Sequence, residues 1–210
     1  MAHIGSLCPT LTGHLNPMIA IGRELQRRSH RVTVVGFIDG KTKVVSAGLN
    51  FLALGISQFP PGSTWESIKT LGELNGLAAL MYSLRVVEQA TEILLEEGPP
   101  AIANTDIDFL LVDQSFYSGS TLAQVLSLPF VTVCCALMFN PEPDIPPFFT
   151  PWHYRSTGWA RLRNRVGYQL LAILGRGQIR QISRYRQQQQ LPPLDYAHGT
   201  FSNMEQFCQR

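Results

Sequence analysis

Two side chains of this 210-residue chain have the types and positions that acid–base chemistry requires. His14 lies in the sequence CPTLTGHLNPM, directly after the apolar stretch 2–8, and Asp113 ends the apolar stretch 108–113. A neutral imidazole can accept a proton, and a carboxylate on its other ring nitrogen fixes the tautomer and stabilises the imidazolium. The two residues therefore suggest a general base and its orienting partner. Spacing by itself favours the alternative, a solvated loop histidine and an aspartate that caps a helix.

The elements that would position these residues alternate along the first part of the chain. Valine- and leucine-rich stretches predict strands at 2–8, 30–37, 50–55, 108–113 and 129–137, with helical patterns between them. This alternation predicts an α/β fold, a doubly wound, mostly parallel, Rossmann-like sheet flanked by helices, with its core at about residues 1–138. Ligands bind such sheets outside the carboxyl ends of the strands, where the strand order reverses. We expect His14 and Asp113 at that edge.

The helix that follows His14 is expected to begin at Asn16 and Pro17, because asparagine caps helices well and proline fits the first helical position. Gly13 would allow a tight turn before it. The free amides and the dipole at this helix start favour an anion such as phosphate, and we expect them to lower the pKa of the His14 imidazole.

The rest of the chain is mainly helix and loop. A long helical pattern at 65–97, broken once, is expected to stop at GPP, residues 98–100. A proline-rich loop follows the sheet at 140–152, and helical patterns cover about 156–190. We expect residues 1–210 to form a single domain.

Composition excludes several classes of protein. The chain is 45% hydrophobic with a formal charge of +2, which indicates a globular protein and does not suggest a nucleic-acid partner. The start of the chain lacks the features of a signal peptide, and no apolar run is long enough to span a membrane, so we expect a cytoplasmic protein. The chain has four cysteines, Cys8, Cys134, Cys135 and Cys208. No pair of them has C-x-x-C spacing, which predicts thiols in the core rather than a metal site.

A dinucleotide-binding enzyme is one alternative for such a sheet. Asp39, after the second predicted strand, could bind a ribose. The loop after the first strand has only Gly13 where the dinucleotide fingerprint needs three glycines, so this alternative has weak support.

The stretch GHLNPMIAIGRELQRRSHRVTVVG resembles the opening of the family-one, UDP-dependent glycosyltransferases. Their N-terminal halves read G-H-x-x-P, followed by L-x-x-R-G-H-x-V-T; here these positions are Gly13-His14, Pro17 and LQRRSHRVT, with Ser29 in place of the usual glycine. LLVDQSFYSG resembles the strand that supplies the family's second catalytic residue, at Asp113. The nearest similarity is to the bacterial macrolide and zeaxanthin glucosyltransferases, and it covers essentially the whole chain.

The resemblance implies the N-terminal domain of a GT-B fold, in which two Rossmann-like domains face each other across a cleft. The N-terminal domain holds the acceptor and the other domain holds the nucleotide sugar. His14 would be the general base on the acceptor hydroxyl and Asp113 its partner, with Thr12 and Gly13 near the donor phosphates. UDP-sugar is then a co-substrate, transfer is a single inverting displacement, and no metal or further cofactor is needed.

Members of this family are usually about twice as long, and their Gly- and His-rich donor-binding signature has no counterpart in the final residues TFSNMEQFCQR. The C-terminal donor domain is therefore expected to be absent. The chain could be a fragment, a natural truncation, or one subunit of an enzyme whose donor domain is a separate partner chain. We expect no transfer without a donor-binding half. A non-catalytic remnant that binds a lipid or a partner is the other alternative.

A small hydrophobic acceptor, such as a carotenoid, macrolide or lipid-like molecule, is suggested by apolar side chains near the ends of the fourth and fifth strands. The candidate acceptor-binding residues are Phe116, Met138, Phe139, Phe148, Phe149 and Trp152.

A basic stretch, Arg155–Arg186, lies within residues 145–190, which contain no aspartate or glutamate. The favoured interpretation is a set of helices whose apolar sides pack on the domain and whose arginines are solvated. The alternative is peripheral contact with anionic lipid on the inner membrane face.

Overall fold

The protein is described by a computed structural model that covers residues 1–137, 141–147 and 149–194. One parallel sheet of five strands forms its centre, in the order β3-β2-β1-β4-β5. The strands are β1 (His3–Leu7), β2 (Arg31–Phe37), β3 (Asn50–Leu54), β4 (Phe109–Asp113) and β5 (Phe130–Val133). The predicted α/β class, with a doubly wound parallel sheet, is confirmed.

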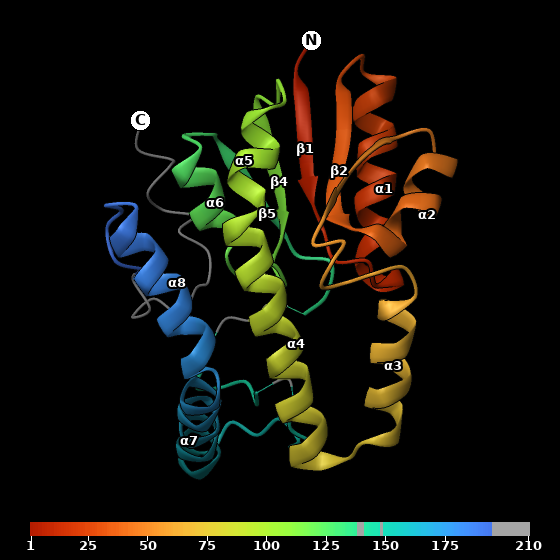
Figure 1. Cartoon of the computed structure of the whole chain (residues 1–210). Coiled ribbons are helices and arrows are strands. Elements are labelled where there is room, and N and C mark those ends of the chain that lie inside the picture. Colours follow the sequence, from red (N-terminus) through yellow and green to blue (C-terminus); the bar gives the residue numbers. More distant parts are fainter. Residues whose placement is uncertain (138–140, 148, 195–210) are drawn as a thin grey trace.

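Helices connect the strands and cover both faces of the sheet. They are α1 (Thr12–Arg27), the 3-10 turn η1 (Ile38–Gly40), α2 (Lys41–Ser46), α3 (Ser63–Glu73), α4 (Gly76–Glu96), α5 (Gly98–Ala103), α6 (Gly119–Val125), α7 (Gly158–Leu174) and α8 (Arg176–Gln188). In Figure 1, α4, α5 and α6 lie in front of the sheet, and α3 and the start of α4 extend below its lower edge.

Alternation of side chains along the strands gives each face its own core. Val35 on β2 joins a cluster with Leu94 of α4 and Leu122 of α6, whereas its neighbour Val34 joins a second cluster with Met18 of α1. These valines are fully buried because both faces of a parallel sheet are covered by helices. The sheet therefore forms a rigid base for side chains placed at its edges.

The strand order reverses between β1 and β4. β1 pairs with β2 on one side and with β4 on the other, and Leu7 at the end of β1 lies opposite Val112 on β4. Side chains that follow these two strands must therefore be neighbours at the carboxyl edge, which is the switch point where ligands bind in such sheets.

The start of α1 differs from the prediction at Asn16 and Pro17. The helix begins at Thr12, because the carbonyl of Leu11 accepts the N–H groups of His14 at 3.0 Å and Leu15 at 2.9 Å. Pro17 lies inside the helix, where its missing N–H removes one bond near an end that is already incomplete. His14 is thus part of the first helical turn rather than of a preceding loop.

Two other boundaries can be compared with the prediction. The 65–97 pattern is broken once as expected, with α3 ending at Glu73 and α4 starting at Gly76. The long helix α4 ends at Glu96, directly before GPP as expected, but a further short helix, α5, begins at Gly98. Proline is tolerated there since the first turn of a helix needs no N–H donor.

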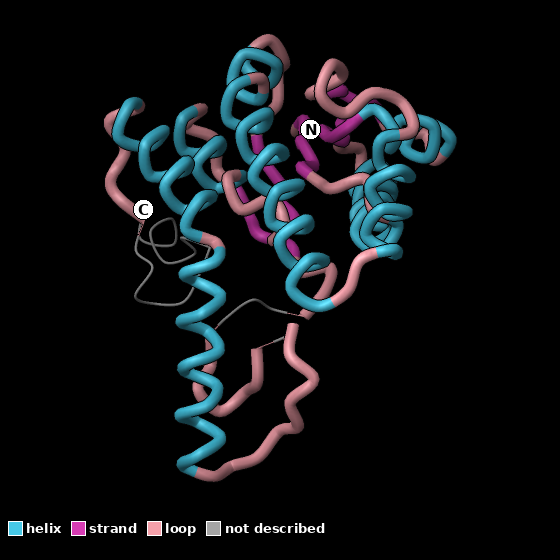
Figure 2. The backbone as a smooth tube through the Cα atoms, turned by 60° about the horizontal axis from the view of Figure 1, so that its bottom comes forward, coloured by secondary structure: helices cyan, strands magenta, loops and turns pink. Residues whose placement is uncertain are grey.

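The predicted helical segment after the proline-rich loop is present as α7 and α8, which meet at Gly175. Thr157 caps α7 by accepting the N–H of Ala160. Figure 2 shows α7 extending away from the sheet with loop residues beside it. The described helices include none that is both long and apolar enough to cross a membrane.

The favoured interpretation of the basic stretch is wrong in two respects. Most large apolar side chains of α7 are exposed rather than packed on the domain; for example, Trp159 is 72% exposed. Arg186 is not solvated, because it is buried and donates to Thr121 on α6 and to the carbonyl of Pro192. Its guanidinium thus holds α8 against the sheet domain.

Candidate active site

His14 and Asp113 meet at the switch point of the sheet. Asp113 is the last residue of β4, and His14 lies in the first turn of α1, which follows β1. His14 Nδ1 is 2.9 Å from Asp113 Oδ2. The predicted pair therefore forms, although its members are far apart in the sequence.

The Asp113 carboxylate is completely buried, and its two oxygens have different partners. Oδ2 faces His14, whereas Oδ1 accepts the backbone N–H of Ser115 at 2.8 Å. The Cys135 thiol, which follows β5, also donates to this carboxylate. A buried carboxylate held in this way has one orientation, so it can fix the tautomer of His14 with the proton on Nδ1.

The hydrogen bond between His14 and Asp113 changes the pKa of both groups. It raises the pKa of His14 above its ordinary value of 6.5, against the lowering effect of partial burial. Burial acts to raise the pKa of Asp113, but the hydrogen bonds from His14, Ser115 and Cys135 outweigh it and hold that pKa below its ordinary value. The expected lowering of the His14 pKa by the helix start is therefore wrong, because the hydrogen bond to Asp113 raises this pKa.

The carboxylate also affects its neighbours. Burial and the negative charge of Asp113 raise the pKa of Tyr117 to about 12. Burial, a hydrogen bond to Asp113 and the charge of Asp113 raise the pKa of Cys135 to about 12. Burial also raises the pKa of the Cys8 thiol. These three groups therefore stay neutral, and His14 is the group near Asp113 that can change its protonation near neutral pH.

The second ring nitrogen of His14 is available for chemistry. Within the described residues no hydrogen bond to Nε2 is found, and the side chain keeps 18% of its surface exposed. With Nδ1 protonated towards Asp113, Nε2 is an acceptor. The pair can therefore take a proton from a hydroxyl group that approaches this edge.

Thr12 and Gly13 form the open start of α1 beside His14. Leu11, the residue before the helix, provides no side-chain cap, so the first N–H groups face outwards. A Cβ at Gly13 would have nothing within 4 Å, and the Gly13 backbone is helical rather than left-handed. The absence of a side chain thus leaves space above the helix start, instead of permitting the tight turn that we expected.

The predicted acceptor-binding residues lie in different surroundings. Phe116 is a buried core residue whose ring packs edge-on against Phe37, with 5.9 Å between ring centroids. Trp152 is half-buried, and the Arg163 guanidinium lies 4.8 Å from its ring centroid. Phe149 is also half-buried. Met138, Phe139 and Phe148 lie outside the described residues.

Asp39, the candidate ribose ligand, has a structural role. Its two carboxylate oxygens accept the N–H groups of Gly62 at 2.7 Å and Thr64 at 2.8 Å, at the start of α3. Both oxygens are thus used in capping a helix, which argues against the dinucleotide alternative.

Sequence reasoning missed Ser115 and Cys135 as parts of this site. Ser115 lies two residues after Asp113, a spacing at which a carboxylate often accepts a backbone N–H, so a local signal existed. Cys135 was predicted only as a core thiol, and its contact depends on the pairing of β4 with β5. No group of three or more potential metal ligands occurs among the described residues.

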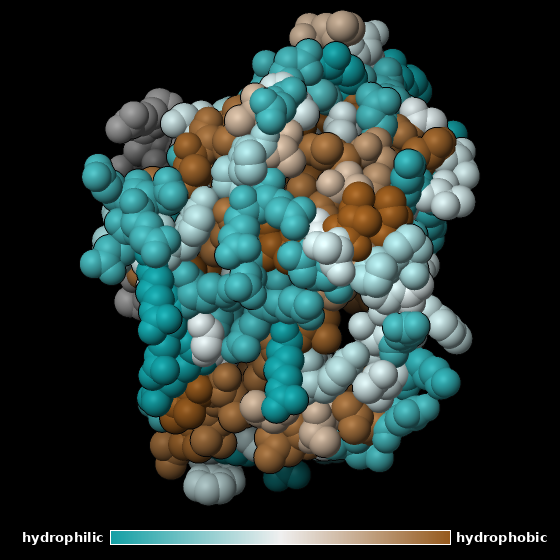
Figure 3. All heavy atoms as spheres, viewed as in Figure 1, coloured by the Kyte–Doolittle hydropathy of each residue, from teal (hydrophilic) through white to brown (hydrophobic). Residues whose placement is uncertain are grey.

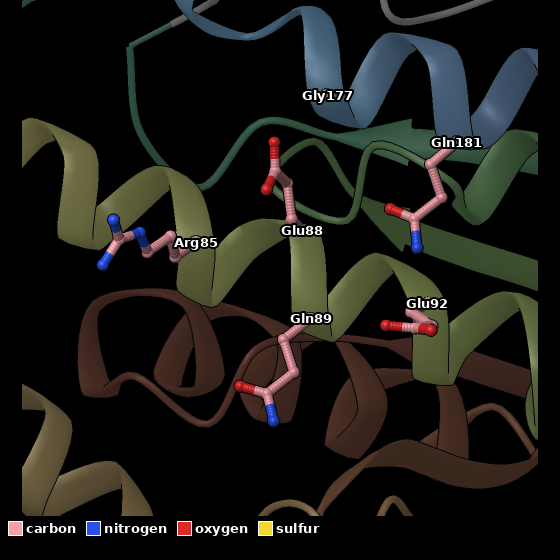
Figure 4. Close-up of a pocket in the computed structure, with 6 residues that line it drawn as sticks. All are labelled: Arg85, Glu88, Gln89, Glu92, Gly177 and Gln181. Carbon is pink, nitrogen blue, oxygen red and sulfur yellow. The ribbon is translucent and has the colours of Figure 1, made fainter.

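The described surface also contains two cavities away from the His14–Asp113 pair. A cavity of about 350 Å³ lies between α3 and α4 and is lined by Phe59, Tyr82 and several polar residues. Another, of about 380 Å³, lies between α4 and α8 (Figure 4), where Glu88 points towards Gly177. A Cβ at Gly177 would collide with the Glu88 carboxylate, so this hollow reflects the close crossing of two helices.

Comparison with known proteins agrees with this architecture. The chain is 29% identical to the zeaxanthin glucosyltransferase of Pantoea ananas over 209 residues, which is 100% of this chain and 48% of that protein. It is also 29% identical to the zeaxanthin glucosyltransferase of Pseudescherichia vulneris over 198 residues, covering 91% of this chain and 45% of the relative. The chain thus spans about half the length of these relatives. No protein-family model matches it.

The structure resembles a solved glycosyltransferase. The glycotransferase of kitacinnamycin superposes with a TM-score of 0.64 at 17% identity, covering 94% of this chain and 43% of that one. The fold is therefore that of the N-terminal domain of a GT-B glycosyltransferase, and the resemblance seen in the sequence is confirmed.

Proposed function

We propose that this chain is the acceptor-binding half of an inverting glycosyltransferase, with His14 as the general base. One observation carries the proposal: Nδ1 of His14 is held by the buried carboxylate of Asp113, while the ring keeps an exposed edge at the switch point of the sheet. This is the geometry that a base needs when it must accept a proton from an incoming hydroxyl group.

In the proposed reaction, Nε2 of His14 takes the proton of an acceptor hydroxyl group. The oxygen then attacks the anomeric carbon of the sugar, and the bond from that carbon to the phosphate oxygen breaks as the nucleoside diphosphate leaves. Asp113 stabilises the imidazolium as it forms, and because its carboxylate is fully buried the pair stays in one geometry. The open amides of Thr12 and Gly13 would stabilise negative charge on the departing phosphates.

The acceptor in this proposal is a hydrophobic molecule with a hydroxyl group. The support comes from the relatives, which are zeaxanthin glucosyltransferases, and from half-buried aromatic side chains such as Trp152 and Phe149 in the loop beside α7. UDP-glucose would be the donor, bound mainly by a second half. Since the chain spans about half of the relatives, we propose that transfer needs such a half, in the same polypeptide or in a partner chain.

A fusion protein tests the proposal. The 210 residues are joined to the second half of the Pantoea ananas enzyme, and glucosylation of zeaxanthin with UDP-glucose is followed by chromatography. We expect His14→Ala to lower the rate by about 10²–10⁴-fold. His153→Ala, at an exposed histidine in the loop before α7, is the control and should leave the rate unchanged.

An unchanged rate in His14→Ala would exclude this residue as the base. A chain that binds zeaxanthin equally well with and without His14, while the fusion protein forms no glucoside, would favour the non-catalytic binding remnant instead.

A further inference from the structure

Helix α7 packs on the protein through two small residues and one asparagine. Its buried residues are Ala160, Asn164 and Gly167. Asn164 donates from Nδ2 to the carbonyl of Pro143 at 2.9 Å, and a Cβ at Gly167 would come within 2.9 Å of the Trp152 ring. This side of the helix therefore holds the proline-rich loop in place.

Five large apolar side chains of α7 lie away from that contact. They recur at intervals of three or four residues, so they lie on one side of the helix over its whole length. Their exposed fractions range from 46% for Val166 to 72% for Trp159. We call this set the α7 stripe: Trp159, Leu162, Val166, Leu170 and Ile173.

Such a surface is unusual on a water-exposed helix. Scattered apolar residues are common, but an aligned row of a tryptophan and four aliphatic side chains marks a surface that binds something. Figure 3 shows brown, hydrophobic atoms gathered at the lower end of the molecule, over α7 and the start of α4.

The charges near the stripe indicate what it binds. Residues 145–190 contain eight arginines and no acidic residue. Of these arginines, Arg161 pairs with Asp144, Arg163 lies over Trp152 and Arg186 is buried. The other five are exposed and form no salt bridge with any described residue: Arg155, Arg165, Arg176, Arg180 and Arg184.

We propose that the α7 stripe docks on a lipid bilayer that contains anionic headgroups. The apolar side chains enter the boundary between headgroups and acyl chains, and the exposed arginines neutralise lipid phosphates around it. Charge complementarity favours lipid over a second copy of this chain, because a second copy would bring the same excess of exposed arginines, on α7, on α8 and in the loop before α7, to the contact.

This inference rests on α7 and α8 and uses no property of His14 or Asp113. Docking can therefore fail while sugar transfer is intact, and transfer can fail while docking is intact. If both hold, the proline-rich loop that α7 carries would be brought to the membrane, where a hydrophobic acceptor is concentrated.

Flotation with vesicles tests the docking surface. The full chain is mixed with vesicles of phosphatidylcholine alone, or with about one third phosphatidylglycerol, and the bound fraction is measured after centrifugation. We expect binding to the anionic vesicles, and much weaker binding to the neutral ones. The double change Leu162→Ser and Leu170→Ser should reduce binding by at least about tenfold. The control is Val45→Ser with Ile56→Ser, which removes equally exposed apolar side chains elsewhere.

Charge is tested separately. Arg176→Gln and Arg180→Gln should each weaken binding to anionic vesicles by about fivefold. Arg23→Gln, at an exposed position on α1, is the matched control and should have little effect. These surface changes keep the test decisive if the stripe variant fails to fold, which circular dichroism would reveal.

Trp159 reports the depth of docking. Brominated lipids should quench its fluorescence, and Trp159→Phe should remove most of the quenching while the protein still floats. Equal binding to neutral and anionic vesicles, or unchanged flotation of a folded stripe variant, would overturn the proposal. The proposal would also be overturned if light scattering showed a dimer for the original chain and a monomer for the stripe variant, with no difference in flotation. That result would identify the stripe as a self-association surface.

Discussion

His3 and His14 both place Nδ1 2.9 Å from an aspartate oxygen, but the two pairs lie at opposite edges of the same sheet. His3 starts β1 and meets Asp106 at the amino edge, whereas His14 follows β1 and meets Asp113 at the carboxyl edge. Asp106 is 73% exposed, and the Asp113 side chain is completely buried. The same pair of residue types thus occurs in two opposite environments.

The difference shows that a histidine–aspartate contact is not by itself a catalytic arrangement. His3 has both ring nitrogens engaged, since Nε2 is 2.7 Å from Thr33 Oγ1 and Nδ1 also lies 2.8 Å from Arg31 Nη2. Its ring links β1 to β2 and has no nitrogen left for a substrate. His14 has a buried carboxylate on one side and an exposed edge on the other, which is what proton transfer requires.

The largest difference between the two pairs should appear in catalysis. Asp113→Asn in the fusion enzyme should lower glucosylation by about 10²–10⁴-fold, because the amide no longer fixes the tautomer or stabilises the imidazolium. Asp106→Asn should leave the rate unchanged. The rates of the two variants are compared under saturating UDP-glucose, and similar losses in both would mean that neither aspartate acts in the chemistry.

The free energy of unfolding should depend on the amino-edge pair, which is not expected to affect the rate. His3→Ala removes a buried ring that contacts Thr33 and leaves that hydroxyl without its partner, so the free energy of unfolding should fall by about 1–3 kcal/mol. Urea unfolding of the 210-residue chain measures this loss. The rate of the fusion enzyme per folded molecule should not change, and a loss of rate without a loss of stability would contradict a structural role for His3.

The protonation of the carboxyl-edge pair should depend on pH in a defined way. Asp113 raises the pKa of His14 above 6.5, which means that the contact stabilises the folded chain when His14 is protonated. This stabilisation is fully present below pH 6.5 and is lost as the pH rises through the folded-state pKa of His14. The pKa of Asp113 is held below 3.8, so its contribution is present above that pH and is lost as the pH falls through the lower folded-state pKa.

Asp113→Asn should therefore destabilise the chain more at about pH 5.5 than at about pH 9. In the same variant, nuclear magnetic resonance should show a lower pKa for His14, because the hydrogen bond that raises it is lost. A His14 titration that is identical in the two proteins would show that the contact with Asp113 does not form in solution.

The smallest effect is expected at the helix start beside His14. Gly13→Ala should raise the free energy of unfolding by up to about 1 kcal/mol, because a helical position gains a better helix former and its Cβ meets nothing within 4 Å. In the fusion enzyme the same change should raise the KM for UDP-glucose, since the methyl group occupies the space above the open amides. Gly5→Ala is the contrasting change in β1. Its Cβ would come within 2.7 Å of Leu110, so it should destabilise the chain.

Much of the fold was predictable because it depends on local patterns. The strands were located by short apolar stretches, and the helical pattern expected from about residue 156 is present as α7, which begins at Gly158. The errors occurred where a local rule competed with a neighbouring contact. Asn16 is a good cap, but the carbonyl of Leu11 already bonds the N–H groups of His14 and Leu15.

The sequence by itself determined the alternation of strands and helices, the types of the two site residues and the absence of acidic residues from 145 to 190. Only the tertiary structure decided that β1 lies beside β4, which brings His14 to Asp113 and not to another carboxylate. It also decided that the small side of α7 faces inwards and its apolar stripe outwards. The reason is that periodicity along a chain defines the sides of a helix or strand, whereas the partner of each side depends on contacts between residues far apart in the sequence.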